Sequence, residues 1–162
     1  MNTESQYRDK IERHIRLAVS RSGDPASLRE RERAVRFLLD HSDLSYARLI
    51  QLIQDKPESF EAPRLIELVG LFKQDASIAA LKMLLLRGKP DTSRAAGRAL
   101  AAIDTLAARQ ALKEGLESDI IEVRIAVIDG VRLSGDKAWC PFLYTALQDN
   151  NANLRYYAVN SA

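Results

Sequence analysis

Residues 133–155 read Leu-Ser-Gly-Asp-Lys-Ala-Trp-Cys-Pro-Phe-Leu-Tyr-Thr-Ala-Leu-Gln-Asp-Asn-Asn-Ala-Asn-Leu-Arg and carry the clearest structural signals in the chain. A polar Ser-Gly-Asp turn stands near the start, and a second polar break follows at 149–153. Between the breaks, Leu143 and Leu147 are one helical turn apart, so both lie on one face of a helix. Polar turns on both sides of this pattern predict half of a helical hairpin.

The same pattern recurs along the chain at a step of 30 or 31 residues. One ladder consists of arginines that each precede a mostly apolar stretch: Arg33, Arg64, Arg94, Arg124 and Arg155. A second ladder, at a step of 31, is aliphatic: Ile50, Leu81, Leu112 and Leu143. Two ladders in phase indicate an internal repeat in which each unit has a first and a second helix.

We predict helices at about 4–22, 26–41, 43–55, 59–73, 75–87, 91–103, 105–118, 120–133, 137–149 and from 152 onward, and no strand. One hairpin cannot bury its apolar face alone, so neighbouring hairpins must stack. The expected fold is all-α, an α-solenoid of stacked antiparallel helical hairpins, in other words an α-α superhelix. We predict one domain over 1–162, with an N-terminal cap helix at 1–24, four hairpins at 25–151 and a partial or capping helix at 152–162.

Composition agrees with a folded domain. The chain has 162 residues, 46% of them hydrophobic, and a formal charge of +2. Its polar start lacks the pattern of a secretory signal, and no apolar run approaches the ~20 residues that span a bilayer, so we expect a cytoplasmic protein. Cys140 is the only cysteine, which excludes an internal disulfide and fits a reducing compartment. We expect it to be small and buried.

The unit at 133–155 resembles a HEAT-like repeat of the short bilin-lyase type, whose pattern runs Leu-Gly-Asp, apolar-Pro-x-Leu, Ala-Leu-x-Asp and Val-Arg. The stretch Leu-Glu-Ser-Asp-Ile-Ile-Glu-Val-Arg at 116–124 repeats the closing half. The resemblance covers about 33–162. It implies an armadillo-like scaffold that mediates protein binding, and a subset of this family, the phycobilin lyases and their relatives, helps to attach bilins to light-harvesting proteins.

The arginine ladder has two interpretations. In the first, each guanidinium fastens adjacent units through carboxylates such as Asp91, Asp119 or Asp149 and through helix-end carbonyls, using a donor fork that lysine lacks. In the second, the arginines form a positive stripe for an acidic peptide or a phosphate backbone. We favour the structural role, because nearby Asp and Glu residues would cancel most of such a field.

The second helices present a possible binding row. The position after each aliphatic ladder residue is polar or aromatic in every unit: Gln51, Lys82, Lys113 and Tyr144. In solenoids of the type that the chain resembles, second helices line the concave face, so a protein or peptide could lie along this row. Ordinary solvated surface is the alternative.

The aromatic residues near the C-terminus allow different roles. We expect Trp139 to belong to the core, although aromatic side chains also anchor interfaces. Tyr156, Tyr157 and Val159 begin an apolar face in the final helix. That helix either caps the stack or docks on another chain, including a second copy of this one.

No set of residues in the sequence suggests catalysis. His14 and His41 lack the spacing of metal ligands, and the glycines form no phosphate loop. We therefore expect no metal and no cofactor, and a non-catalytic scaffold or adaptor that binds a protein or peptide. The alternatives are a bilin-lyase-like protein that handles a chromophore and, with a charge of only +2, a nucleic-acid-backbone binder.

Overall fold

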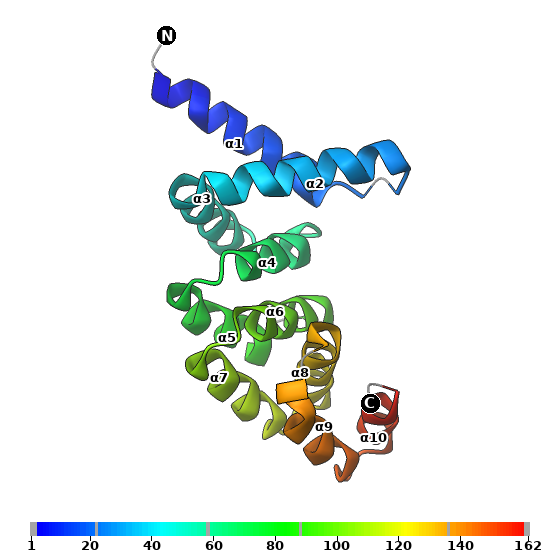
Figure 1. The fold of residues 1–162 in the computed structure, drawn as a ribbon. Coiled ribbons are helices and arrows are strands. Elements are labelled where there is room, and N and C mark those ends of the chain that lie inside the picture. The colour runs from blue at the N-terminus through cyan, green and yellow to red at the C-terminus, as the bar shows by residue number, and fades with distance from the viewer. Residues whose placement is uncertain (1–2, 22, 58, 88, 136, 161–162) are drawn as a thin grey trace.

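A computed structural model describes residues 3–21, 23–57, 59–87, 89–135 and 137–160. These residues are all-α and contain ten α-helices and two short 3₁₀ turns (Figure 1). The helices are α1 (Thr3–Val19), α2 (Pro25–Asp40), α3 (Ser42–Asp55), α4 (Ala62–Leu71), α5 (Ile78–Arg87), α6 (Pro90–Ile103), α7 (Leu106–Leu116), α8 (Ile121–Ser134), α9 (Cys140–Leu147) and α10 (Ala152–Val159). The 3₁₀ turns, Asp75–Ser77 and Lys137–Trp139, precede α5 and α9.

Local sequence explains where several helices begin and end. The Asp24 side chain accepts hydrogen bonds from the amides of Ala26 and Ser27 at the start of α2, and the side chain of Asn151 does the same for α10. Gly135 ends α8 with a φ of 64°, a left-handed conformation that glycine adopts without steric cost. Several boundaries differ from the expected ones: α1 ends at Val19, α4 spans only 62–71, and α5 and α9 begin three residues later than predicted, after the 3₁₀ turns.

Most helices pack against their neighbours in the sequence, and α6 also packs extensively against α4 and α8. The helices α2, α4, α6, α8 and α10 occupy the first-helix positions of the units, and α3, α5, α7 and α9 the second-helix positions. The helix α5 packs against α6 and has little contact with α4, its partner within the unit. The molecule is elongated, with α1 at one end and α10 at the other (Figure 1).

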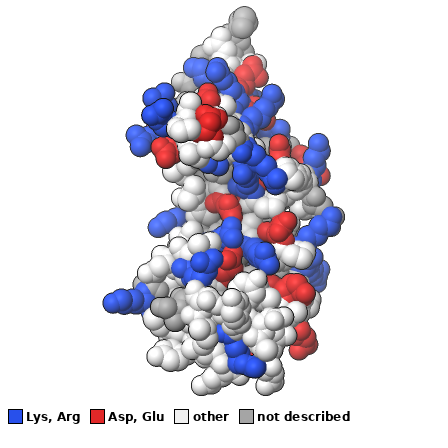
Figure 2. Space-filling model, turned by 90° about the vertical axis from the view of Figure 1, so that its right-hand side faces the viewer, with Lys and Arg blue, Asp and Glu red and all other residues white. Residues whose placement is uncertain are grey.

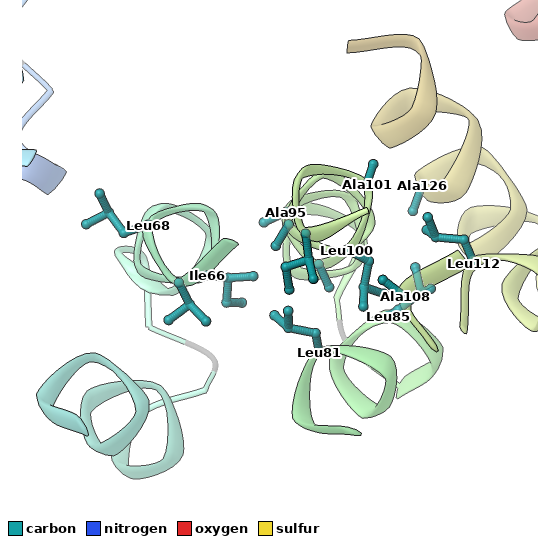
Figure 3. Close-up of a cluster of buried hydrophobic side chains, with 14 of the residues drawn as sticks. Ile66, Leu68, Leu81, Leu85, Ala95, Leu100, Ala101, Ala108, Leu112 and Ala126 are labelled. Carbon is teal, nitrogen blue, oxygen red and sulfur yellow. The ribbon is translucent and has the colours of Figure 1, made fainter. Parts of the chain in front are cut away.

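The core runs along the stack as one continuous apolar cluster. Figure 3 shows its central part, where Leu81 and Leu85 of α5 meet Leu100 of α6, and Leu112 of α7 lies toward α8. Leu81 and Leu112 of the aliphatic ladder are buried, whereas Ile50 and Leu143 are partly buried against the cluster. Each fully buried leucine stabilises the fold by about 1.5–3 kcal/mol.

Three helices in first positions approach one another backbone to backbone, because glycines stand at their contacts. A Cβ atom on Gly70 of α4 would lie 2.7 Å from the Cα atom of Ala99 in α6. A Cβ atom on Gly130 of α8 would lie 2.5 Å from the carbonyl carbon of Gly97 in α6. Contacts between α5 and α7 and between α7 and α9 are sparser. The closest packing therefore lies on the first-helix side of the stack.

The N-terminal helix α1 lies across the first pair. Ile11, Ile15, Ala18 and Val19 are buried, α1 packs mainly against α2, and Glu12 forms an ion pair with Arg48 of α3. The helix α2 does not pack against α4 in the way that α4 packs against α6. The first pair joins the rest of the molecule mainly through the contact of α3 with α4.

The prediction that Cys140 is buried is wrong: it is exposed at the first position of α9, because the preceding Trp139 takes the inward position and is only 1% exposed. Among the described helices, none is long and apolar enough to cross a bilayer.

Candidate functional site

Three of the five ladder arginines donate hydrogen bonds to backbone carbonyls at helix ends or loops. Arg64 of α4 donates to the carbonyls of Val19, at 2.6 Å, and Ser20. Arg124 of α8 donates to the Ser118 carbonyl at 2.7 Å and, from its other Nη, to Asp149 at 3.2 Å. Arg155 of α10 donates to the carbonyls of residues 149 and 150, at 2.8 and 3.0 Å.

These bonds support the structural interpretation at three of the five positions. The other two ladder arginines make no such bond to a described residue. Of the three expected carboxylate partners, Asp149 receives an arginine, whereas no described bond joins Asp91 or Asp119 to the ladder. Arg33 is exposed on α2, and Arg94 is half-buried on α6. Neither makes a hydrogen bond or ion pair with the residues that the structure describes.

A second charged ladder, which the sequence analysis missed, crosses three helices in first positions. Arg98 of α6 donates to Glu67 of α4 at 2.8 Å and to Asp129 of α8 at 2.8 Å. Burial alone would lower the pKa of Arg98, but the hydrogen bonds to Asp129 and Glu67 raise it overall. The three residues are spaced by 31, so a search for opposite charges at the repeat step would have found them.

The predicted binding row lies on four different second helices. Gln51 of α3 is exposed and accepts a hydrogen bond from Arg48 at 3.0 Å. Lys82 of α5 forms an ion pair with Glu114 of α7, which holds the pKa of Glu114 below its usual range. Lys113 of α7 is exposed, and Tyr144 of α9 is 68% exposed.

Helix packing brings part of this row together. The ion pair of Lys82 with Glu114 bridges α5 and α7, and α7 in turn contacts α9. Lys82, Lys113 and Tyr144 therefore belong to three successive helices that touch. Gln51 belongs to α3, which packs against α4 rather than extensively against α5.

The C-terminal aromatic residues divide into buried and exposed ones. Trp139 packs edge-on against Phe142, and the guanidinium of Arg109 lies 4.7 Å from the centre of its ring, so the expectation of a core position is confirmed. On α10, Leu154 and Ala158 are buried, whereas Tyr156 and Val159 are 69% and 62% exposed. The last helix thus has an outer face with aromatic and aliphatic side chains.

A polar cavity of about 480 Å³ opens where the start of α6 faces α4. Basic residues from four parts of the chain line it: Arg21, Arg64, Lys89, Arg94 and Arg98. Glu67 and Asp91 are the acidic residues on its wall. Within the described ranges, no cluster of three or more His, Cys, Asp or Glu side chains could hold a metal ion.

Comparison with known protein families finds no match. The curated proteins and the solved structures likewise include none that matches the chain.

Proposed function

We propose that this protein is a non-catalytic interaction scaffold, an α-solenoid of HEAT-like hairpins that binds a protein or peptide along its second helices. The observation that carries the proposal is the ion pair between Lys82 and Glu114. It joins two successive second helices next to the row, because Glu114 directly follows Lys113, and so brings Lys82 beside the part of α7 that carries Lys113. A continuous surface of this kind is what stacked repeats use to hold an extended partner.

The α-solenoid is proposed because the step of the sequence repeat agrees with the contacts between helices. A step of 31 residues corresponds to two helices, and α4, α6 and α8, each two helices apart, stack on one another. The resemblance to short HEAT-like repeats implies that the second helices form a concave face. The backbones approach one another most closely among the helices in first positions. We therefore define the proposed binding surface by its residues, Lys82, Lys113 and Tyr144, and not by whether the second-helix side is concave.

The chemistry of the surface suggests which contacts matter most. Tyr144 offers a large, exposed aromatic ring, and Lys113 offers an exposed ammonium group. Aromatic side chains are enriched among the few interface residues that carry most of the binding energy. Lys82 is already paired with Glu114, so its substitution would also disturb the contact between α5 and α7. Tyr144 and Lys113 are therefore the cleaner positions for a test.

The test compares two tyrosines of nearly equal exposure. Proteins captured from the source lysate by the unmodified chain are identified by mass spectrometry, and capture is repeated with Tyr144→Ala, with Lys113→Ala and with Tyr156→Ala. If the second helices bind, Tyr144→Ala weakens the dominant partner by about 2 kcal/mol, a typical loss at an interface anchor. Tyr156→Ala, at 69% exposure on α10, leaves that partner bound.

Other outcomes would redirect the assignment. If only Tyr156→Ala loses the partner, the binding surface lies on α10. If light scattering shows that the unmodified protein is a dimer and that Tyr156→Ala is a monomer, the partner at α10 is a second copy of this chain. Unchanged capture in all three variants would refute the row as a site. A coloured tetrapyrrole or nucleic acid recovered in place of a protein would favour one of the alternative functions.

A further inference from the structure

The polar cavity between α4 and α6 has a wall rich in guanidinium groups. Its basic residues come from the α1–α2 connection, from α4, from the residue before α6 and from α6 itself, so segments far apart in the sequence converge there. Figure 2, which looks onto the right-hand side of the molecule in Figure 1, shows charged side chains gathered over the upper and middle parts of this face. The lower part of the face is mostly uncharged.

The positive charge on this wall is only partly neutralised. Arg98 is balanced by Glu67 and Asp129, which flank it on both sides. Arg64 donates to the carbonyls of Val19 and Ser20, which carry no formal charge, so its own charge remains. Arg94 is half-buried and has no hydrogen bond or ion pair among the described residues. A guanidinium in that position has donors available for a ligand.

The start of α6 adds further donors to the same wall. Lys89 precedes the helix and provides no side-chain cap, and Pro90 has no amide hydrogen. The amides of Asp91 and Thr92 lie in the first turn, where no carbonyl of the helix can accept from them, and both residues line the cavity. Thr92 is only 5% exposed, yet no described group is hydrogen-bonded to its hydroxyl. Thr92 therefore offers the cavity a hydroxyl that has no described partner, which supports a polar ligand.

We propose that this cavity binds a phosphate monoester group. A guanidinium, helix-terminal amides and a hydroxyl are the donors with which proteins hold phosphate. A monoester dianion has three terminal oxygens and can accept from donors in several directions, whereas a carboxylate has two oxygens in one plane. The volume of about 480 Å³ leaves room for the group that carries the phosphate.

Asp91 is the acidic residue that opposes such a ligand. Glu67, the other carboxylate on the wall, is occupied by Arg98. Asp91 lies in the first turn of α6 and no described basic side chain pairs with it. Its charge therefore reduces the attraction of the cavity for an anion. Removal of this charge and removal of the Arg94 charge should change anion affinity in opposite directions.

The test measures binding of inorganic phosphate and O-phosphoserine by titration calorimetry at pH 8. Both probes should saturate a single site on the unmodified protein. Arg94→Gln should weaken binding about tenfold, since a charge-assisted hydrogen bond is lost. Asp91→Asn should strengthen it. Arg33→Gln is the matched control, because it removes the same charge from the equivalent ladder position on α2, where Arg33 is exposed and outside the cavity.

The proposal is overturned if neither probe binds saturably, or if Arg33→Gln weakens binding as much as Arg94→Gln. Tighter binding of a single-stranded oligonucleotide than of either monoester would also overturn it. Circular dichroism checks that each variant is folded. Two further probes, a phosphoserine peptide and a sugar phosphate, distinguish a modified protein from a small metabolite as the source. The result does not depend on the second-helix surface, since Tyr144 and Lys113 lie outside the cavity.

Discussion

Arg124 shows how a single residue of the ladder contributes to stability. Its side chain is only 16% exposed, and its guanidinium joins the loop before α8, at the Ser118 carbonyl, to Asp149 before α10. Two separate acceptors require donors that point in different directions, which a guanidinium has and an ammonium group on a flexible stem lacks. One side chain thereby connects the loops of adjacent units.

We expect Arg124→Lys to destabilise the protein although the charge is retained. The loss should be about 1–3 kcal/mol in the free energy of unfolding, because a partly buried acceptor is left without its donor. Urea unfolding followed by circular dichroism measures it. Arg33→Lys, at the exposed ladder position on α2, should change stability little. Equal effects of the two substitutions would show that the ladder arginines stabilise only through charge.

The contact between Lys82 and Glu114 predicts a pH effect at another single site. The hydrogen bond from Lys82 lowers the pKa of Glu114 in the folded state. A lowered folded-state pKa means that the pair contributes stability above the pKa of unfolded glutamate and loses it as the pH falls through the folded value. Both side chains are more than a third exposed, so solvent screening keeps the contribution small.

Carbon-detected NMR titration of the Glu114 carboxyl tests this contact directly. In Lys82→Met, the pKa of Glu114 should rise toward that of an ordinary glutamate, because the ammonium donor is gone. In Lys113→Met, which alters the neighbouring residue in the sequence, it should stay low. A Glu114 pKa that is unaffected by Lys82→Met would mean that the two helices do not hold this pair in solution.

At the scale of elements, the helices in first positions are held together by close contact of their backbones. Gly97 of α6 faces the carbonyl of Ala126 in α8, and Gly130 of α8 faces Gly97 in return. Glycine inside a helix normally costs about 0.5–1 kcal/mol relative to alanine. The close approach of α6 and α8 explains why that cost is tolerated, because a methyl group at either position would overlap backbone atoms of the facing helix.

Gly97→Ala should therefore destabilise the protein, although alanine favours helix formation. Forcing α6 and α8 apart should cost about 1–3 kcal/mol, as other overpacked cores do. Thermal unfolding provides the measurement. Gly23→Ala is the control, since nothing lies within 4 Å of a Cβ atom at that position outside the helices. A stabilised Gly97→Ala variant would contradict the packing of these two helices.

At the scale of the whole molecule, packing is concentrated in the middle. The helices α4, α6 and α8 form the most extensively packed set, whereas α2 lacks the corresponding contact with α4. Because packing is uneven along the molecule, stability should differ along its length. The centre should resist opening more than either end.

Hydrogen exchange measured by mass spectrometry should reveal this gradient. Amides of α6 should exchange most slowly, those of α8 next, and those of α2 and α10 faster. The reason is that α6 is covered by both α4 and α8, whereas α2 lacks the corresponding contact with α4 and α10 packs mainly against α8 and α9. Uniform protection from α2 to α10 would show instead that the molecule opens as a single cooperative unit.

Much of the helical arrangement could be predicted from the sequence, and much of the candidate surfaces could not. Periodic apolar residues and polar turns placed ten helices in the correct order, with errors at ends such as that of α4. Position in the repeat also assigned structural bonds to all five ladder arginines. Arg64, Arg124 and Arg155 make such bonds, whereas Arg33 and Arg94 make none with the described residues. The prediction that Cys140 is buried was wrong, because only one of the two adjacent residues points into the core, and that residue is Trp139.

The positions and order of the helices and the repeat step follow from the spacing of apolar and turn residues. The sequence alone therefore determined them. The charges of Glu67, Arg98 and Asp129 stand at the repeat step in the sequence, and the folded molecule shows that they pair. Two features required the folded molecule: the close approach at Gly97 and Gly130, and the basic cavity between α4 and α6. Each joins residues some thirty positions or more apart. The distances between these residues depend on how one helix packs against the next. The spacing of residues along a single helix does not determine that packing.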